Sequence, residues 1–526
     1  MDNRFSRRTW LGSVAGMAGA ATAGAGVEQT QAFQTYFGDI HNHGNVGYAQ
    51  GSLRRAFEIA RNHLDFFAYT PHAHWNDIRH FEGNIEEKWI NGFHVTRARW
   101  PEVLSMAREF DVSGRFVTLA GYEWHSTNLG DYHIIFPDLN AELFTPNGLK
   151  ELQAFAARRG CIMIPHHLSV RQGRRGANFA HCDPRVSPVV EIFSEWGNSE
   201  HDRAPFPFIR HTEPGRWTKN TLQYILAQGR RFGVIASTDD HLGYPGGYGE
   251  GLAAILAPEL SRQAILDALR NRRTYAVTGD RILLSFTLNG QVMGRELPYV
   301  RDRKIRVSAT GWDQVDRVEV LKNNRVIHRD FPMDRVTGPA SWSKPVLARF
   351  EYGWGPWPAL GITRTCDWDF TVALEGGVLE ALQTCFLPGP LDEDRRDRVA
   401  ERTERSVRVR SFTALRQQLE DRSQKAVVLK MRGGPDTRIR VALTAPVKAS
   451  LEMTFRELAE SSETLYTGEF PRESALLNRI VFNEHYETSF EVHDSGDGKQ
   501  ADYYYVRVVQ ANGQLAWSSP IWVENT

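Results

Sequence analysis

Cysteine is scarce in this sequence, with four residues in 526. So few thiols cannot build a disulfide framework for a chain of this length, and no Cys-x-x-Cys pair exists to supply a thiolate zinc site. Cys161 lies in the apolar run CIMI, which predicts a core residue. The sequence leaves open whether Cys366 and Cys385 pair with each other.

An excess of charge of either sign is also missing, because 63 Lys and Arg residues balance 63 Asp and Glu residues. Without net charge there is no long-range attraction to phosphate polymers, so we expect no nucleic acid partner. Neither a Gly-x-Ser-x-Gly elbow nor a Gly-x-x-x-x-Gly-Lys-Ser/Thr loop occurs. These absences disfavour a serine hydrolase and a nucleotide-binding P-loop protein.

Long hydrophobic runs are absent apart from one short, Gly-rich stretch near residue 20, so we expect no membrane span in the mature protein. Arg7 and Arg8 precede this stretch, and Ala23 and Ala25 offer a small-x-small cleavage site. Residues 1–30 resemble a twin-arginine signal and linker, which implies the twin-arginine export machinery as a partner and a periplasmic or secreted protein. A disordered Gly- and Ala-rich tail is the alternative.

Residues 35–280 alternate short apolar runs with helical patterns, which is typical of an α/β domain with a parallel sheet or barrel. Ser52 can cap a helix whose apolar positions, from Leu53 to Leu64, recur at helical spacing before the strand DFFAYT. Ser261 can cap a second helix, RQAILDALRNRR, that closes this domain. The stretch LGYPGGYGEG, which contains Tyr244, predicts either a mobile substrate loop or a plain turn.

Residues 281–526 change to alternating strands with little helical periodicity. Turn signals such as Asn289-Gly290 and Asn323-Asn324 separate these strands. The pattern predicts a β-rich, sandwich-like region. Residues 391–425 are dense in Arg, Asp and Glu, which favours a charged insertion, helical or in a loop, over a binding patch.

Six apolar runs of the first region end in histidines or carboxylates: YFGDIHNH, DFFAYTPHAHW, RFVTLAGYEWH, CIMIPHH, PVVEIFSEW and RFGVIASTDDH. In a parallel α/β barrel the carboxyl ends of the strands meet at one face, where catalytic residues gather. Histidines and carboxylates without thiolates suit Zn, Mn or Fe, and several of them in one pocket suit a multinuclear site. The sequence therefore predicts a divalent-metal site on this face.

The motifs GDIHNH, YTPHAHW, GYEWHS, IPHH and STDDH, in this order, resemble the polymerase and histidinol phosphatase (PHP) family of metal-dependent phosphoesterases. The resemblance covers about residues 36–280 by motifs, and it is closest to a branch of the family with a β-rich tail. It implies an α/β fold in which a PHP-like distorted (β/α)7 barrel precedes the sandwich-like region. It also implies metal-dependent hydrolysis of a phosphoester.

The resemblance implies eight metal ligands in this chain: His41, His43, His72, Glu123, His133, His166, Asp239 and His241. His41 and His43 form an x-spaced pair that can chelate one ion, because alternate strand residues point the same way. Glu123 matches the glutamate that bridges two metals. Pro71 stands where the family has an aspartate, and Ala49 stands in place of a further histidine. Two metals are therefore implied, and a third is left open.

Three residues beside these motifs are candidate catalytic groups: His74, His167 and Glu200. His74 or His167 could protonate a leaving group, or could orient a neighbouring ligand as His125 also could. Each candidate has a structural alternative, since a lone histidine is more often a core or surface residue. Glu200 could serve loop structure only, and Glu123 could be the buried partner of an arginine.

These features predict an exported metal-dependent phosphoesterase that uses metal-activated water on a small-molecule or envelope-derived ester. The phosphate group rests on the family likeness, so hydrolysis of another ester, an amide or a sulfate bond stays open. A further alternative is an envelope carbohydrate-binding protein with structural metals, in which tryptophans would stack on sugars: Trp312, Trp342, Trp354 and Trp357. Chelation separates these alternatives, because only the enzyme must lose its function with its metal.

Overall fold

The computed structural model describes residues 33–208, 215–338, 340–354, 365–389, 393–414 and 424–526. The predicted signal in residues 1–30 lies outside this part of the chain. In the described residues, no helix combines the length and the apolar character needed to cross a membrane. The four cysteines are buried, and Cys366 and Cys385 lie on strands of different sheets.

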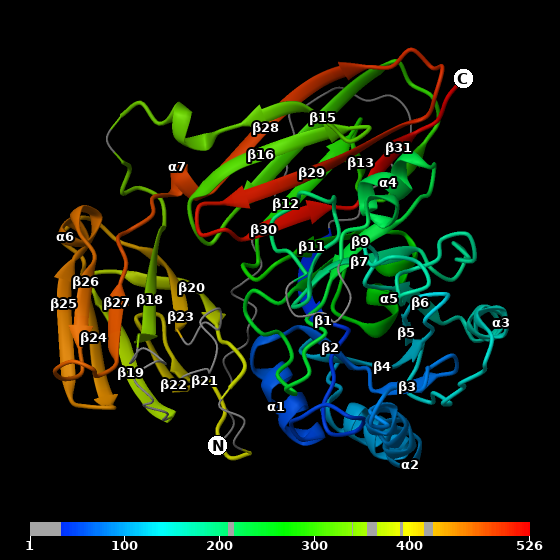
Figure 1. The fold of residues 1–526 in the computed structure, drawn as a ribbon. Helices are drawn as coiled ribbons and strands as arrows, with labels where there is room; N and C mark the ends of the chain where they lie inside the picture. The colour runs from blue at the N-terminus through cyan, green and yellow to red at the C-terminus, as the bar shows by residue number, and fades with distance from the viewer. Residues whose placement is uncertain (1–32, 209–214, 339, 355–364, 390–392, 415–423) are drawn as a thin grey trace.

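A mixed fourteen-stranded sheet runs through the molecule (Figure 1). Its strands are β1 (Gln34–Asp39), β2 (Phe66–Tyr69), β3 (His72–Trp75), β4 (Val117–His125), β5 (Tyr132–Ile135), β6 (Ile162–Pro165), β10 (Leu252–Ala257), β11 (Thr274–Val277), β14 (Glu296–Leu297), β16 (Val315–Lys322), β17 (Arg325–Asp330), β29 (Asp502–Gln510), β30 (Leu515–Ser518) and β31 (Ile521–Val523). The main path is β14-β31-β29-β30-β11-β10-β1-β2-β4-β5-β6. Because β11 pairs with β30, strands from both ends of the chain share this sheet.

The predicted distorted (β/α)7 barrel is wrong, because the described strands do not form a ring of parallel neighbours. Strands β1 to β4 pair in parallel, but β5 and β6 continue the sheet antiparallel. Strands β7 (Val189–Ser194) and β9 (Gly233–Ala236) pair with each other in a separate three-stranded sheet that includes β8 (Gly197–Asn198). The loop between β4 and β5 covers only residues 126–131. A parallel crossover needs about a dozen residues or more, so these two strands form a hairpin instead.

Helices are a minor part of the structure. The described α-helices are α1 (Leu53–His63), α2 (Glu86–Phe110), α3 (Leu149–Arg159), α4 (Leu222–Ala227), α5 (Arg262–Arg270), α6 (Phe455–Glu460) and α7 (Asn483–Tyr486), with 3-10 turns η2 (Thr218–Asn220) and η3 (Pro332–Arg335). Both predicted caps are confirmed, since the Ser52 side chain accepts from the Arg55 N–H and the Ser261 side chain from the Ala264 N–H. Each cap satisfies an amide that the first helical turn leaves unpaired.

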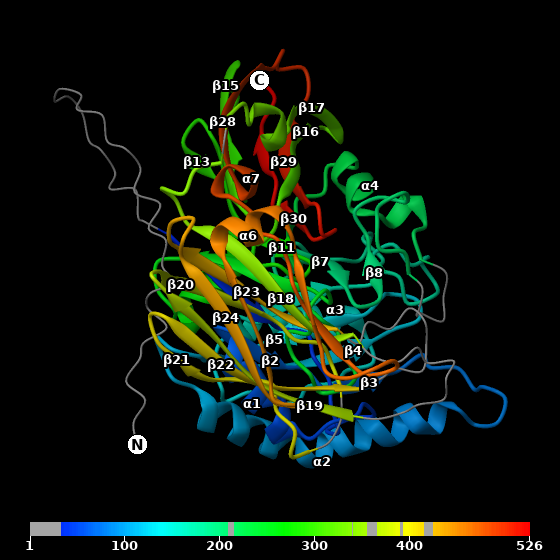
Figure 2. The ribbon, with the colours of Figure 1, turned by 90° about the vertical axis from the view of Figure 1, so that its left-hand side faces the viewer.

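Most of the remaining strands form three antiparallel sheets. A four-stranded sheet contains β12 (Leu283–Leu288), β13 (Gln291–Val292), β15 (Asp302–Thr310) and β28 (Glu487–Ser495). One five-stranded sheet contains β18 (Val346–Trp354), β20 (Val378–Cys385), β23 (Lys425–Arg432), β26 (Glu463–Tyr466) and β27 (Ser474–Leu477). A second five-stranded sheet contains β19 (Thr365–Glu375), β21 (Arg398–Arg402), β22 (Ser406–Ala414), β24 (Arg438–Ala445) and β25 (Ala449–Thr454). We call these two the paired sheets, because they share one apolar core that includes Phe350, Trp368 and Phe370 (Figure 2). The domain boundary near residue 280 stays a prediction.

Part of the predicted charged insertion at residues 391–425 lies in the paired sheets. Strand β22 pairs with both β21 and β19. Val407 and Val409 of β22 are buried, whereas Arg408 and Arg410 alternate with them and contact Asp369. Side chains alternate between the faces of a strand, so the charges gather on one face while the valines pack in the core. These residues therefore form an amphipathic strand rather than a helix or a loop.

Candidate metal centre

The eight predicted metal ligands come together in one cluster. His41 and His43 follow β1, His72 begins β3, Glu123 lies in β4, His133 lies in β5, His166 follows β6, and Asp239 and His241 follow β9. All of them are buried except His241, whose side chain is 27% exposed. The sequence thus predicts the members of this cluster, although the strands that carry them do not close into a barrel.

The Glu123 carboxylate lies within the cluster and faces histidines with both oxygens. Its Oε1 lies 2.7 Å from His166 Nε2 and 3.3 Å from His125 Nδ1. Its Oε2 lies 3.3 Å from His72 Nε2 and 3.4 Å from His43 Nε2. The two oxygens thus face different pairs of rings, which is the arrangement that a carboxylate needs to bridge two ions.

Asp239 joins the two histidines of the first motif to His167. Its Oδ1 lies 3.0 Å from His43 Nε2 and 3.4 Å from His41 Nε2, and its Oδ2 lies 3.4 Å from His167 Nε2. Asp239 and His167 have φ values of +53° and +50°, in the left-handed region that residues other than glycine seldom adopt. Backbone strain of this kind concentrates at functional sites, where the surrounding structure maintains it.

Several sets of three side chains could each hold a metal ion, because their ligand atoms lie within 4.8 Å of one another. These sets include His41, His133 and His166; His43, His72 and His241; His41, His43 and Asp239; and His72, Glu123 and His125. The rings also pack closely, since the centroids of His43 and His72 are 3.7 Å apart and those of His41 and His166 are 4.3 Å apart. Rings this close cannot all carry a proton charge without strong repulsion.

The polar atoms of the cluster fit a cation better than they fit one another. Among the described residues, His41 Nε2, His133 Nε2 and Glu123 Oε2 are buried without a hydrogen-bond partner. Buried polar atoms without a partner are rare and costly. Burial lowers the pKa of His43 to about 3, and burial followed by the charge of neighbouring histidines lowers the pKa of His72 and His133 well below the usual range. Neutral rings offer the lone pairs that a divalent metal requires.

Two of the three candidate catalytic residues lie outside the cluster. His74 is half-buried, and its Nε2 lies 3.2 Å from Asn147 Oδ1. The register of β3 on β4 shifts between His72 and His74, so that Trp75, rather than His74, lies opposite His125. This irregularity removes the simple alternation that would have aligned His74 with His72.

Glu200 is fully buried, and its carboxylate accepts hydrogen bonds from the strands near the end of the chain. Oε1 accepts from the Tyr505 hydroxyl at 2.8 Å, Oε2 accepts from Trp517 Nε1 at 2.8 Å, and Arg507 Nη1 donates to both oxygens. These contacts give Glu200 a structural role between residues 197–200 and strands β29 and β30. The third candidate, His167, does lie in the cluster, beside Asp239.

Sequence reasoning missed two carboxylates of the site. Glu191 Oε2 lies 3.0 Å from His41 Nδ1, on the ring nitrogen that faces away from Glu123 and Asp239. Asp131 Oδ2 lies 2.7 Å from Arg175 Nη2, and Asp131 Oδ1 lies 3.5 Å from His125 Nδ1. A carboxylate partner of this kind fixes the orientation and tautomer of a metal-ligating histidine. A glutamate inside the apolar strand β7, VVEIFS, was the available signal for Glu191.

His241 marks the accessible side of the cluster. It is the most exposed of the eight ligands, and Glu195, which lies 3.8 Å from His241 Nδ1, has a side chain that is 11% exposed. The half-exposed ring of Tyr48 stacks on His72 with centroids 3.8 Å apart. Solvent therefore reaches the cluster at His241, whereas His41 and His133 are fully buried.

Comparison with known proteins gives relatives without a known activity. A family model described as "Protein of unknown function (DUF3604)" matches residues 247–295. An uncharacterized protein of Chlamydia trachomatis is 28% identical over 46% of this chain and 43% of its own length. An uncharacterized protein of Chlamydia pneumoniae is 28% identical over 50% of this chain and 46% of its own length. An uncharacterized protein of Chlamydia muridarum is 27% identical over 51% of this chain and 50% of its own length. The chain thus spans about half the length of these curated relatives.

One solved structure also shows a distant likeness. It is a two-domain protein of Bacteroides vulgatus, described as containing a predicted PHP-like metal-dependent phosphoesterase. The match covers 80% of this chain and 96% of that one, at 12% identity and a TM-score of 0.30. A score this low does not establish a shared fold. The case for a metal centre therefore rests on the side chains of this protein.

Proposed function

We propose that this protein is an exported metal-dependent hydrolase that cleaves a phosphoester at a site with two divalent ions, and with room for a third. The observation that supports it best is Glu123, whose two carboxylate oxygens face different pairs of buried histidines. The alternative, a structural ion pair between Glu123 and an arginine, is not favoured, because the side chains in contact with the Glu123 carboxylate are histidines.

The ligands fall into two groups on either side of Glu123. His41, His133 and His166 would hold one ion, and His43, His72 and His241 would hold the other, with Glu123 and Asp239 between them. Zn, Mn and Fe all accept such histidine and carboxylate sets. Bound metal would supply a water acidic enough to form hydroxide near neutral pH, and positive charge for the oxygens of the substrate.

The protein's own groups would orient the substrate and move the proton. The substrate would enter beside His241, the exposed ligand, which places the reacting bond next to the His43, His72 and His241 group. Of the two flanking histidines, His167 is the better proton donor to the leaving group, because it lies within 3.4 Å of Asp239 whereas His74 lies outside the cluster. Glu191 would hold the His41 ring in place through its Nδ1.

Phosphate as the substrate group rests on the resemblance of the motifs to the PHP family. The same metals could hydrolyse a carboxylic ester, an amide or a sulfate, since one site can serve several chemistries. The export of the protein to the periplasm rests on the twin-arginine motif, and the substrate would then be a small molecule or a product of the cell envelope. Fractionation of cells that produce the full chain, against a variant with Arg7 and Arg8 changed to Lys, tests export.

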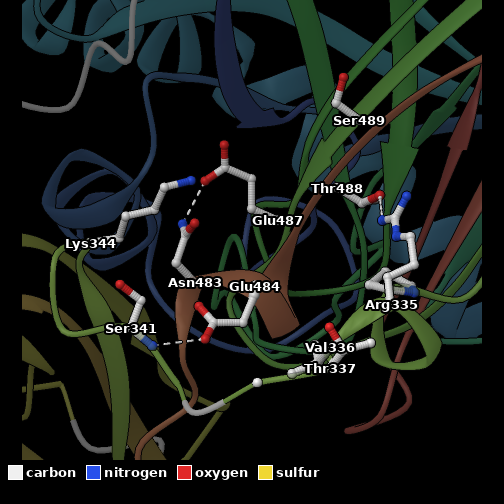
Figure 3. Close-up of a pocket in the computed structure, with 12 residues that line it drawn as sticks. Arg335, Val336, Thr337, Ser341, Lys344, Asn483, Glu484, Glu487, Thr488 and Ser489 are labelled. Carbon is white, nitrogen blue, oxygen red and sulfur yellow. Dashed lines mark hydrogen bonds between the residues drawn. The ribbon is translucent and has the colours of Figure 1, made fainter.

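Two of the four tryptophans proposed for sugar binding, Trp312 and Trp342, pack in or against apolar cores. Trp312 is buried, and Trp342 packs on the core of the paired sheets against Phe455 and Phe482. Trp357 and the side chain of Trp354 lie outside the described part of the structure. A hollow of about 530 Å³ between η3 and α7 is lined by polar groups such as Lys344 (Figure 3). Among its described lining residues there is no aromatic ring on which a sugar could stack.

The test is to measure metal and turnover on the same sample. The purified protein should contain divalent metal, and it should hydrolyse generic phosphomonoesters or phosphodiesters until a chelator removes the ion. Activity should return when Mn²⁺ or Zn²⁺ is added back. Metal-loaded protein that hydrolyses carboxylic esters, amides or sulfates but no phosphoester would replace the phosphate proposal with the runner-up. Protein that binds no metal would overturn the proposal as a whole.

A further inference from the structure

Residues 239–244 carry two ligands of the cluster and then leave it. Asp239 and His241 lie in the cluster, and Asp240 between them accepts hydrogen bonds from the backbone of the same loop. Asp240 Oδ2 accepts from Leu242 N at 3.0 Å and from Tyr244 N at 2.6 Å. The position of Tyr244 is therefore tied to that of the ligands through one short, hydrogen-bonded turn.

The sequence predicted either a mobile substrate loop or a plain turn around Tyr244, and the structure places this residue in an apolar core. Its side chain is 1% exposed and belongs to the apolar core of the paired sheets, with Tyr352, Trp368 and Phe370. Those residues come from β18 and β19, more than a hundred positions later in the chain. The loop that carries Asp239 thus sends one large side chain into the core of the paired sheets.

The hydroxyl of Tyr244 is hydrogen-bonded to a buried ion pair. It donates to Asp397 Oδ2, which also accepts from Lys425 Nζ at 2.7 Å. The other oxygen, Oδ1, accepts from Ser411 Oγ at 2.5 Å. Asp397 and Lys425 are 4% and 2% exposed. A charge pair this deeply buried is maintained only when its remaining hydrogen-bonding capacity is satisfied, and the tyrosine supplies one of those bonds.

Helix α1 reinforces the same connection from a second direction. The buried Arg55 donates from Nη1 to the Gly243 carbonyl at 3.4 Å, and its guanidinium lies 5.8 Å from the centre of the Tyr244 ring. At the surface, Ser52 of the cap donates to Glu393, and Arg396 contacts Glu58 of α1. Residues 239–244, helix α1 and the segment that contains Glu393 and Arg396 are therefore packed together.

We propose that Tyr244 is a positioning residue that anchors the metal-ligand loop to the paired sheets, so that Asp239 and His241 keep the geometry that binds metal. This inference rests on the proposed metal site. It gives the paired sheets a function in the same reaction: they maintain the shape of the metal centre from outside, through the Tyr244 hydroxyl and the buried pair of Asp397 and Lys425.

The experiment compares Tyr244→Phe with Tyr352→Phe in the full chain. Both variants remove one buried hydroxyl from the same core, because the Tyr352 hydroxyl donates to Ser411 Oγ at 2.8 Å. Only Tyr244→Phe changes a residue of the loop formed by residues 239–244. Mn²⁺ binding is measured by titration calorimetry, and amide hydrogen exchange of residues 239–246 is measured without metal. Thermal unfolding of the metal-free proteins controls for loss of stability.

We expect Tyr244→Phe to weaken Mn²⁺ binding by about tenfold, the lower end of the effect of losing a direct outer partner of a metal ligand, because Tyr244 acts one step further from the ligands. It should also speed exchange at the Leu242 and Tyr244 amides, while Tyr352→Phe leaves both within twofold of the parent. Equal effects of the two variants, or parental binding and exchange in Tyr244→Phe, would overturn the inference. If the parent chain binds none of Mn²⁺, Zn²⁺ and Fe²⁺, the proposed function fails, and the exchange measurement alone decides whether Tyr244 anchors the loop.

Discussion

Replacing Glu123 with Gln tests the central geometric claim about the metal centre. The substitution keeps the shape of the side chain but turns one oxygen into an amide, which cannot bind a cation. Both oxygens of Glu123 face histidines at 2.7–3.4 Å, so either rotamer of the glutamine removes a ligand atom from one of the two groups. Glu123→Gln should therefore weaken binding and prevent the carboxylate from bridging two ions.

The expected size of the effect follows from the position of the residue. Loss of an outer partner costs about 10–100-fold in metal affinity, so loss of a direct ligand should reach at least about 100-fold, or about 2.7 kcal/mol. Metal present at about 100 times the parental Kd stabilises the parent by about 2.7 kcal/mol, and the same concentration would stabilise the variant by only about 0.4 kcal/mol. Addition of metal should therefore raise the Tm of the parent clearly and the Tm of Glu123→Gln only slightly.

The assay measures bound metal by elemental analysis, Tm with and without added metal, and turnover. Metal content, the metal-induced rise in Tm and activity should fall together in Glu123→Gln, while the circular dichroism spectrum without metal stays parental. A well-folded Glu123→Gln protein with parental metal content and full turnover would refute the scheme, because no bridging carboxylate would then be needed.

Four further substitutions separate the roles of the remaining carboxylates and histidines. Glu191→Gln should weaken metal binding by about tenfold in calorimetry without unfolding the protein, because it disturbs only the orientation of His41; an unchanged Kd would contradict that role. Glu200→Gln should leave metal content unchanged but lower the free energy of unfolding by about 1.5–3 kcal/mol in denaturant titrations, because Arg507 keeps Glu319 but loses a charged acceptor. Loss of metal at parental stability would argue for the catalytic role instead. His167→Ala should lower kcat by about 10²–10⁴-fold with metal retained, because His167 is the proposed proton donor. The kcat of His74→Ala should stay close to that of the parent, because His74 lies outside the cluster. A larger loss of kcat in His74→Ala than in His167→Ala would reverse the assignment of the proton donor.

The structure brings together eight side chains that the family resemblance picks out of the sequence. Most of them also follow or end a short apolar run, where polar residues are seldom required for packing, whereas His133 lies inside β5. The same reasoning failed for Glu191, which lies inside β7, where a polar residue next to apolar neighbours looks like an irregularity of the core. It also misplaced Glu200, whose environment depends on Arg507, a residue 307 positions away.

The overall architecture was harder to predict than the site. Alternating apolar runs and helices favoured a parallel sheet or barrel, and the family resemblance implied a closed one, but connection length decides whether two strands run parallel. The short link between β4 and β5 forces a hairpin, and β30 then extends the sheet from the far end of the chain. Dense charge in residues 391–425 concealed strand β22, because charges on one face of a strand interrupt an apolar pattern as a loop would.

The sequence by itself determined the chemistry available to this protein: a set of histidines and carboxylates without thiolates, helix caps at Ser52 and Ser261, and turns at Asn289 and Asn323 with φ values of +49° and +48°. Residue type and spacing fix such features within a few positions. Only the tertiary structure decided which oxygen of Glu123 faces which ring, that Glu200 is bound by strands from the end of the chain, and that Tyr244 enters the paired sheets. Those outcomes depend on packing between segments that are far apart in sequence, and no local pattern records which distant segment a side chain will meet.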